Sequence, residues 1–253
     1  MEMKSDPPNA ANDQLGPRSS SRAMNNMFTG LAGRYDLANR VMSLGRDLFW
    51  RRALAGRVGF VDRPGRLLDL AAGTGDQIVA IKKAHPQMEV TGLDLSAAMM
   101  ELAAPKLARL APPIPEMIVG DALAPPFGDE SFDSISISFG LRNIPARDEL
   151  YRQVRRMLKP GGRFLVLEMY HDRRTLLAPL VSFYLRRVAP ALGGRLVSGR
   201  PEAYQYLASS ILGFPQPEDL AAEMTGAGFT ALGIQKFNFN TVMLVTAEKP
   251  RPA

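Results

Sequence analysis

A glycine-rich turn and two acidic residues carry the clearest chemical signal in this sequence. The turn reads DLAAGTGD at residues 69–76, and Asp94 and Asp121 follow it, each after a short apolar run. Glycines let a ligand approach the backbone closely, and the start of a helix offers it unpaired N–H groups. A carboxylate after the next strand can accept hydrogen bonds from ribose hydroxyls, and Asp121 can accept one from the exocyclic amine of adenine. Together these residues indicate a site for a ligand that contains adenosine.

Two positions beside the turn distinguish between adenosine cofactors. A dinucleotide site prefers the pattern G-x-G-x-x-G, but Ile78 stands where the third glycine would be. Asp76 adds a negative charge that would repel a pyrophosphate and that suits a ligand with a sulfonium and an ammonium group. The sequence therefore favours S-adenosylmethionine over NAD, with Asp69, Gly73 and Gly75 in the turn that holds it.

Strands that alternate with helices must position these residues. We expect strands at 66–70, 89–93, 116–119, 133–139 and 163–168, helices at 74–84, 96–110 and 147–158, and a turn at 159–162. A further helix at 217–225 precedes strands at 229–236 and 241–248, which are close enough to pair only as a hairpin. This alternation predicts an α/β fold in which a seven-stranded, mostly parallel sheet has one antiparallel strand and helices on both faces. The carboxyl ends of the strands then bring the turn, Asp94 and Asp121 together.

The composition excludes several kinds of site. The 253 residues contain no cysteine and only two histidines, which excludes disulfides, zinc–thiolate sites and iron–sulfur clusters, and we expect no metal. The net charge of +6 leaves nucleic acid or an anionic membrane surface as candidate partners. Much of the excess is scattered arginine, without a lysine-rich tail or an aromatic-basic RNA motif, so we expect no nucleic-acid partner.

Several longer motifs resemble the family of ubiquinone and menaquinone biosynthesis C-methyltransferases. They are FTGLAGRYDLAN at 28–39, DLAAGTGD at 69–76, FGLRNIP at 139–145, LKPGG at 158–162, YLRRV at 184–188 and AYQYLASSILGF at 203–214. DLAAGTGD and LKPGG are typical of class I methyltransferases in general, whereas FGLRNIP, RYDLAN and AYQYL are much more specific. The resemblance implies a Rossmann-like class I fold with S-adenosylmethionine as cofactor. It also implies an enzyme that methylates a ring carbon of a prenylated quinol, either demethylmenaquinol or the ubiquinol precursor.

The resemblance assigns roles to single residues. The cofactor contacts that it implies are Thr74, Asp94, Asp121, Ala122 and Ser138, together with Tyr35 in a segment that closes over the cofactor. Arg142 and Asn143 match positions that face the quinol. Because a hydroquinone becomes nucleophilic at the ring carbon when its hydroxyl loses a proton, we expect Arg142 to stabilise the phenolate or to polarise a water that removes the ring proton. Asp121 can contribute to either task.

The chain departs from the family pattern at two places, and other functions stay open. Residues 168–172 read EMYHD instead of Glu-Phe-Ser-Lys-Pro, and residues 237–245 read FNFNTVMLV instead of a Thr-Gly-Gly turn with an Ala-Leu-His strand. Both departures leave the exact quinone open. One alternative is methylation of another small molecule or of nucleic acid, although the Pro-Pro-Tyr/Phe type of motif is missing after the fourth expected strand. The other is a non-catalytic cofactor-binding subunit, against which the intact Gly73, Asp94 and Asp121 argue.

The parts of the chain outside the alternating pattern suggest its domain organisation. Residues 1–23 are polar and rich in Pro, Asn and Ser, so we expect a disordered leader. A single methyltransferase domain then covers 24–253. It includes an N-terminal helical lid at 24–60 and a helical insertion at 170–214 for the substrate or a membrane.

The insertion mixes apolar residues with arginine. Arg173, Arg174, Arg186 and Arg187 either lie on a plain helical cap or contact anionic lipid headgroups. No apolar run reaches the ~18 residues that a transmembrane helix needs. We therefore expect a cytoplasmic protein, or one that is peripheral on the inner face of the membrane. A homodimer is a further alternative.

Overall fold

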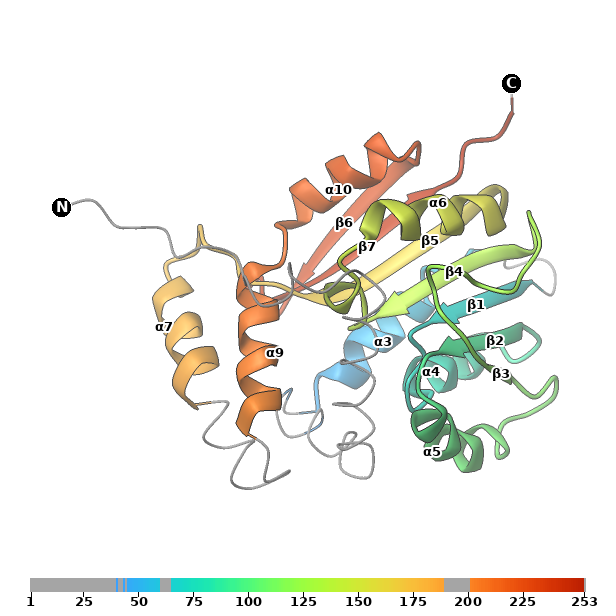
Figure 1. Ribbon diagram of the computed structural model, residues 1–253, viewed down its shortest axis with the longest axis horizontal. Coiled ribbons are helices and arrows are strands. Elements are labelled where there is room, and N and C mark those ends of the chain that lie inside the picture. The colour runs from blue at the N-terminus through green and yellow to red at the C-terminus, as the bar shows by residue number, and fades with distance from the viewer. Residues whose placement is uncertain (1–39, 41–42, 44, 60–64, 189–200, 253) are drawn as a thin grey trace.

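One seven-stranded sheet organises the described part of the chain. The computed structural model describes residues 40, 43, 45–59, 65–188 and 201–252. The strands are β1 (Arg66–Leu70), β2 (Glu89–Asp94), β3 (Glu116–Val119), β4 (Phe132–Ser138), β5 (Leu158–Met169), β6 (Thr230–Phe237) and β7 (Val242–Glu248). Their order is β3-β2-β1-β4-β5-β7-β6 (Figure 1). The pairings of β7 with β5 and with β6 are antiparallel and the other four pairings are parallel, so β7 is the one strand that runs against the rest, and it forms a hairpin with β6. The predicted sheet, with its single antiparallel strand, is confirmed.

Helices cover both faces of the sheet, as predicted. On β5, Phe164 and Val166 belong to one buried cluster, whereas Leu165 and Leu167 belong to the other. The side chains of a strand point alternately to opposite faces, so a fully apolar strand needs cover on both sides. One face packs against α6 (Arg147–Met157) and α10 (Pro217–Gly226), and the other packs against α3 (Asp47–Ala55), α4 (Asp76–Ala84) and α5 (Ala97–Leu107).

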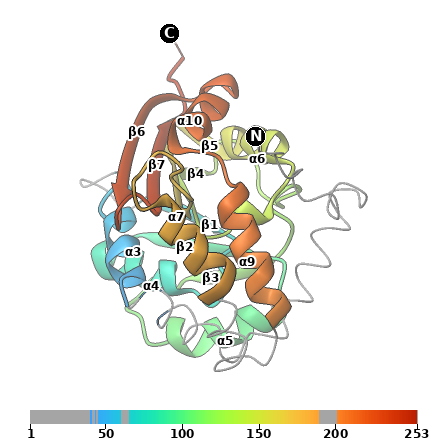
Figure 2. The ribbon, with the colours of Figure 1, turned by 90° about the vertical axis from the view of Figure 1, so that its left-hand side faces the viewer.

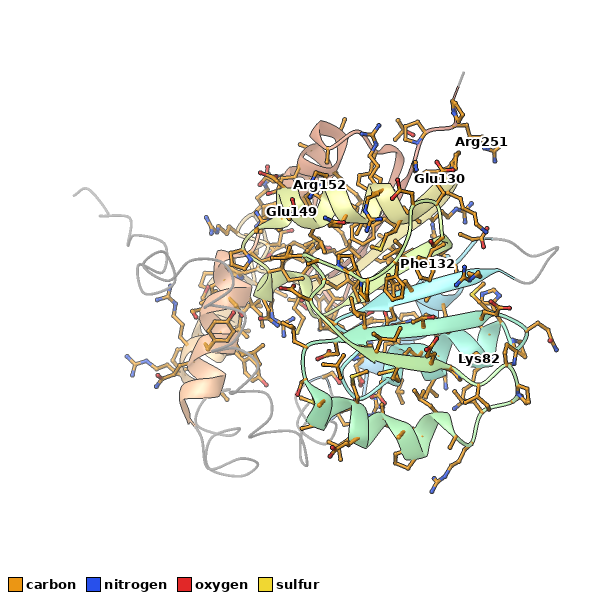
Figure 3. The ribbon with its side chains drawn as sticks, turned by 45° about the vertical axis from the view of Figure 1, so that its right-hand side comes forward. Lys82, Glu130, Phe132, Glu149, Arg152 and Arg251 are labelled. Atoms are coloured by element: carbon orange, nitrogen blue, oxygen red, sulfur yellow. The ribbon has the colours of Figure 1, made fainter. Side chains whose placement is uncertain are left out.

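Helix α6 shows how the sequence pattern sets the helical packing. Its buried residues, Leu150, Tyr151, Val154 and Met157, recur at helical spacing and face the sheet. Residues on the other side are polar, and Glu149 pairs there with Arg152 (Figure 3). Such a two-sided helix forms because its apolar stripe is buried, so its place on the sheet follows from the pattern.

Residues 159–162 differ from the expected turn. They lie inside β5, where the register with β4 shifts from Phe132↔Leu158 to Ser134↔Arg163. The extra residues form a bulge, in which Gly161 has a φ of +74°. A Cβ on Gly162 would lie 2.8 Å from the carbonyl oxygen of Lys159. The two glycines therefore allow the strand to continue through a distortion that in the sequence resembles a turn.

A separate helical layer lies beyond the carboxyl ends of the parallel strands. It contains α7 (Ala178–Phe183), the π-helix η2 (Tyr184–Val188) and α9 (Pro201–Gly213). Figures 1 and 2 show α7 and α9 side by side at this edge of the sheet. Leu185 of η2 packs there against Ala208 and Ile211 of α9 in a small core of its own. None of the helices in the described residues is long and apolar enough to cross a membrane.

The expected leader and most of the expected lid lie outside the described residues. Of the helical lid expected at 24–60, the described part contains α3. Gly45 precedes α3 in a turn with a φ of +75°, a conformation that suits glycine.

Candidate active site

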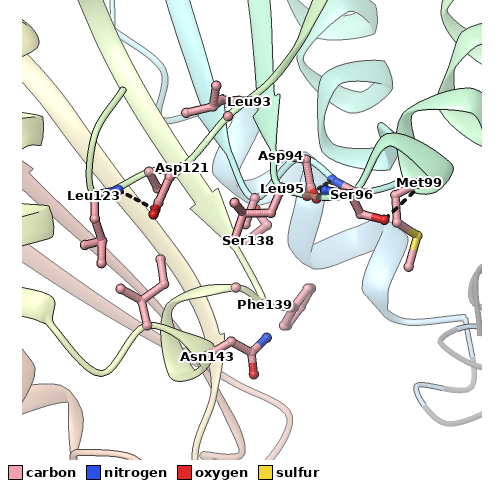
Figure 4. Close-up of a pocket in the computed structure, with 16 residues that line it drawn as sticks. Leu93, Asp94, Leu95, Ser96, Met99, Asp121, Leu123, Ser138, Phe139 and Asn143 are labelled. Carbon is pink, nitrogen blue, oxygen red and sulfur yellow. Dashed lines mark hydrogen bonds between the residues drawn. The ribbon is translucent and has the colours of Figure 1, made fainter. Parts of the chain in front are cut away.

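A cavity of about 120 Å³ opens at the carboxyl ends of β1, β2 and β4 (Figure 4). Of the residues predicted to bind the cofactor, the structure brings five to this cavity: Gly73, Asp94, Asp121, Ala122 and Ser138. They come from the last residues of β2 and β4 and from the loops that follow β1 and β3, and they meet because parallel strands end at the same edge of the sheet.

Asp94 is held in place by the backbone around it. One carboxylate oxygen accepts a hydrogen bond from the Gly73 N–H at 2.8 Å, and the other accepts one from the Ser96 N–H at 2.8 Å. Burial raises the pKa of Asp94, and these two hydrogen bonds oppose that effect. Each oxygen has a second lone pair, so the carboxylate can still accept hydrogen bonds from a ligand in the cavity.

Asp121 and Ser138 line the cavity with different partners. Asp121 accepts a hydrogen bond from the Leu123 N–H at 2.9 Å, which fixes the loop after β3. The Ser138 hydroxyl donates to the side-chain oxygen of Gln77 at 3.0 Å, and the Gln77 amide donates to the Arg51 carbonyl at 3.2 Å. Sequence reasoning missed Gln77, because no local pattern connects a residue of α4 with the end of β4.

Three predicted cofactor residues lie away from the cavity lining. Asp69 is buried beneath it and accepts a hydrogen bond from the Ser136 hydroxyl at 2.6 Å. Thr74 is also buried. Gly75 begins α4 with a φ of +78°, and a Cβ there would approach Ala103 of α5. These three residues support the turn without lining the cavity. Tyr35 lies outside the described residues.

Asp76 does not present the free negative charge that the sequence suggests. Its carboxylate accepts hydrogen bonds from Lys106 at 2.8 Å and from Arg40 at 3.1 Å. Burial works against its ionisation, but Lys106, Arg51 and Arg40 outweigh burial and lower the pKa of Asp76. The argument from repulsion of a pyrophosphate therefore weakens. The absence of the third glycine of a dinucleotide motif still argues against NAD. Ile78, which stands at that position, is fully buried, and a Cβ on Gly92 of β2 would lie 2.8 Å from its side chain.

The loop after β4 turns at Phe139 and not at the neighbouring glycine. Phe139 has a φ of +59°, a strained conformation for an aromatic residue. Gly140 has an ordinary φ, but a Cβ on it would lie 2.7 Å from the Cβ of Ala71. The Phe139 ring lines the cavity, and it packs against Trp50 and beneath the guanidinium of Arg51. Helix α3 thus supports the cavity wall, a role that the sequence did not reveal.

Of the residues predicted to act in catalysis, Asn143 and Asp121 line the cavity, but Arg142 does not. Both Arg142 and Asn143 lie in the short helix η1 (Leu141–Asn143). The Arg142 side chain is 5% exposed and donates to the Glu168 carboxylate and to the Phe139 carbonyl oxygen. Glu168 is fully buried and also accepts from the backbone N–H groups of Arg142 and Met169. Arg142 is therefore part of a buried ion pair that holds the loop.

Tyr206 is a second residue that sequence reasoning missed. It lies on α9, and its hydroxyl donates to the Asn143 side-chain oxygen at 3.2 Å. The motif AYQYLASSILGF pointed to this segment. It did not indicate which of its residues reaches the loop after β4, because the contact joins residues 63 positions apart.

The acceptor groups and apolar side chains that line the cavity fit S-adenosylmethionine. Asp94 and Asp121 supply carboxylate acceptors for hydroxyl and amine groups, and Leu93, Leu95 and Met99 supply apolar walls. Gly73, with a φ of +53°, has open space where a Cβ would lie, which leaves room for a ligand beside the backbone. Among the residues that the structure describes, no cluster of His, Asp and Glu side chains could hold a metal ion.

The sheet order and the cavity at its carboxyl edge are those of the class I S-adenosylmethionine-dependent methyltransferase fold. A solved structure from Thermotoga maritima, described as a SAM-dependent methyltransferase and possible histamine N-methyltransferase, has the same fold. It matches with a TM-score of 0.63 and 16% identity, over 89% of this chain and 99% of that one.

The chain belongs to the ubiE/COQ5 methyltransferase family, whose model matches residues 17–249. It is 41% identical over 208 residues to a demethylmenaquinone methyltransferase of Deinococcus radiodurans, covering 82% of this chain and 85% of the relative. It is 38% identical over 226 residues to the ubiquinone/menaquinone biosynthesis C-methyltransferase UbiE of Geotalea daltonii, covering 88% and 94% of the two chains. Because the family is one of methyltransferases, the chain is a methyltransferase that uses S-adenosylmethionine.

Proposed function

We propose that the protein transfers the methyl group of S-adenosylmethionine to a ring carbon of a prenylated quinol, with demethylmenaquinol as the expected acceptor. The relatives named for demethylmenaquinone and for ubiquinone/menaquinone biosynthesis support this substrate class. The structural observation that carries it is the position of Asn143. This residue of the FGLRNIP loop lines the same cavity as Asp94 and Asp121, so an acceptor beside Asn143 adjoins the cofactor.

In this proposal the strand ends of β1 to β3 hold the cofactor. Asp94 accepts hydrogen bonds from the ribose hydroxyls, and Asp121 accepts one from the adenine amine. The Gly73 backbone and Ser138 lie along the rest of the cavity. When bound, the cofactor supplies an electrophilic methyl group on a sulfonium. The protein contributes by orienting the acceptor carbon toward that group, which removes much of the entropic barrier.

The loop after β4 holds the acceptor. The amide of Asn143 can donate a hydrogen bond to a quinol oxygen as negative charge develops on it, and such a donor favours the transition state. Arg142 has its charge balanced by Glu168, so it stabilises a phenolate less than an unpaired cation would. We therefore assign Arg142 a positioning role beneath Asn143 in place of direct contact with the acceptor. Asp121 remains a candidate for accepting the ring proton, directly or through water.

Quinone analysis of a strain that lacks this protein tests the proposed substrate. We expect the main quinone to be replaced by a form that lacks one ring methyl group, as seen by mass spectrometry. Reintroduction of the wild-type chain should restore the normal quinone, and an Asp94→Ala variant should restore less. A normal quinone in the deletion strain would contradict the proposal.

We also propose that α7 and the residues beside it contact an anionic membrane surface, where a prenylated substrate dissolves. Leu176, Leu180 and Phe183 are exposed large apolar side chains in and just before α7. Arginines flank them on both sides, and all four are exposed: Arg173, Arg174, Arg186 and Arg187. Apolar residues that enter the interface, with cations around them, suit a bilayer that carries negative charge. This layer lies at one edge of the sheet (Figure 2), and the residues that line the cavity lie at the carboxyl ends of the strands at the same edge.

Vesicle binding tests this surface. Binding to anionic vesicles should weaken with added salt, and replacing Arg186 and Arg187 with Gln should weaken it about tenfold. The matched control replaces Arg152 and Arg155 of α6 with Gln, which removes the same charge from exposed positions away from α7. Equal partitioning of the wild type to neutral and anionic vesicles would leave this layer as a helical cap without a membrane role.

A further inference from the structure

Tyr206 and Asn143 connect two parts of the molecule that serve different purposes. Asn143 belongs to the loop that ends β4 and lines the cavity, whereas Tyr206 belongs to α9 in the outer helical layer. Their hydrogen bond, at 3.2 Å, is a direct polar link between the two parts. The other side of α9 is anchored as well, because Ala208 and Ile211 pack against Leu185 of η2.

The direction of this hydrogen bond decides which group Asn143 presents to the cavity. An asparagine amide has one acceptor oxygen and one NH₂ donor group. The Tyr206 hydroxyl donates to the oxygen, so the NH₂ group is left for the cavity side (Figure 4). If the amide turned over, its NH₂ group would donate to the hydroxyl oxygen, because a tyrosine hydroxyl also accepts, and the amide oxygen would then face the cavity. The orientation in the structure, in which Tyr206 donates, is the one that presents a donor to an oxygen of the acceptor.

The surroundings keep the Tyr206 hydroxyl in its donating form. Burial raises the pKa of Tyr206, the charge of Glu168 also raises it, and the charge of Arg142 opposes them. The hydroxyl therefore stays protonated through neutral and mildly alkaline pH. Arg142, which precedes Asn143 in the chain, is bound to the buried Glu168, so the loop that carries the amide is itself fixed.

We propose that Tyr206 is a positioning residue: its hydrogen bond to Asn143 orients the side-chain NH₂ group of Asn143 toward the reacting oxygen of the acceptor. This inference rests on the proposed function for the identity of the acceptor, and on geometry alone for the orientation of the amide. It implies that α9, which lies in the layer that would meet the prenylated substrate, completes the site by fixing one donor of the loop after β4.

A double-mutant cycle in methyl transfer tests the proposal with the full-length enzyme. Tyr206→Phe keeps the ring and removes only the hydroxyl. It should lower kcat about three- to tenfold for transfer from S-adenosylmethionine to demethylmenaquinol, while the affinity for the cofactor stays unchanged. In an Asn143→Ala background, the same substitution should cause no further loss, because Tyr206 acts through Asn143. The control, Gln205→Ala on the exposed side of α9, should keep the wild-type rate.

Three outcomes would overturn the inference. A Tyr206→Phe variant with wild-type kcat would show that the orientation of the amide needs no hydroxyl. Losses that multiply in the double variant would show that Tyr206 acts independently of Asn143. A rise in KM for the quinol at constant kcat would equally reject positioning in favour of simple substrate binding.

A nuclear magnetic resonance measurement separates this inference from the proposed function. The side-chain ¹⁵N–¹H₂ signal of Asn143, identified by its loss in Asn143→Ala, should shift in Tyr206→Phe, and its NH₂ rotation should become faster. Gln205→Ala should leave it unchanged. If the wild type failed to methylate any quinol while this signal responded as expected, the proposed function would fail and the positioning would stand. An unchanged signal would reject the positioning whatever the substrate.

Discussion

Two parallel strands, β2 and β5, carry acidic residues at or next to their last position, with opposite surroundings. Asp94 at the end of β2 lines the cavity, and it accepts hydrogen bonds from the backbone N–H groups of Gly73 and Ser96. Glu168 near the end of β5 is fully buried and is bound to the side chain of Arg142. A carboxylate held by backbone amides keeps lone pairs for a ligand, whereas one that is paired with a buried guanidinium is committed to the frame of the site. Position at a strand end alone therefore does not identify a ligand contact.

The largest expected effect comes from breaking the buried pair. Glu168→Ala leaves the Arg142 guanidinium buried without its carboxylate, so the free energy of unfolding should fall by about 3–5 kcal/mol. Urea denaturation with the same probe on both proteins measures this. The control is Glu149→Ala, which breaks the exposed pair with Arg152 and should change stability little. A Glu168→Ala protein as stable as the wild type would show that the Arg142–Glu168 pair does not hold the site together, and Glu168 would then not differ from Asp94 in the way described.

A smaller effect is expected from Asp69, the buried carboxyl beneath the cavity. Burial raises its pKa from 3.8 to about 7, while the Ser136 hydrogen bond and Arg51 oppose the shift. Between these values the unfolded chain is ionised at Asp69 and the folded chain still holds the proton. Stability should therefore decrease as pH rises from about 4 to about 7, by an amount on the order of 3 kcal/mol, and this contribution should stay constant above that range.

Asp69→Asn isolates this contribution. The difference in unfolding free energy between wild type and variant, followed by denaturation across that pH range, should show the decrease. A flat difference would indicate that Asp69 ionises in the folded protein at its ordinary pKa.

The smallest expected effect concerns the cofactor side of the comparison. Asp94→Ala removes the acceptors proposed for the ribose hydroxyls, which costs about 1–3 kcal/mol of binding and lowers cofactor affinity roughly ten- to hundredfold. Titration calorimetry with S-adenosylmethionine measures the change. Asp219→Ala, at an exposed position of α10, removes the same charge outside the cavity lining and should bind like the wild type. Unchanged affinity in Asp94→Ala would place the ribose elsewhere.

The sequence could predict most of the fold and the cofactor side of the site because both depend on local patterns. Alternating apolar runs identify the strands, and the glycine turn, Asp94 and Asp121 each follow a strand directly. Parallel pairing then brings them together without further information. The expected turn at 159–162 shows the limit of local patterns, because glycines also accommodate a bulge within a strand.

The rest of the site depends on contacts between residues far apart in the chain. Arg142 was expected to face the acceptor because it matches a family position that faces the quinol, but its partner Glu168 lies 26 positions away. Asp76 is paired with Lys106, 30 positions away. Asn143 accepts a hydrogen bond from Tyr206 of the outer helical layer. No periodicity or motif encodes these pairings, since they follow from how the loops and α9 pack against the sheet.

Methyl transfer by the purified protein tests the central claim most directly. The protein is mixed with S-adenosylmethionine that carries a labelled methyl group and with demethylmenaquinol in anionic vesicles, and the product is analysed by mass spectrometry and nuclear magnetic resonance. We predict one labelled methyl group per quinol, bonded to a ring carbon. Label on a quinol oxygen, or label that enters RNA and not the quinol, would contradict the account.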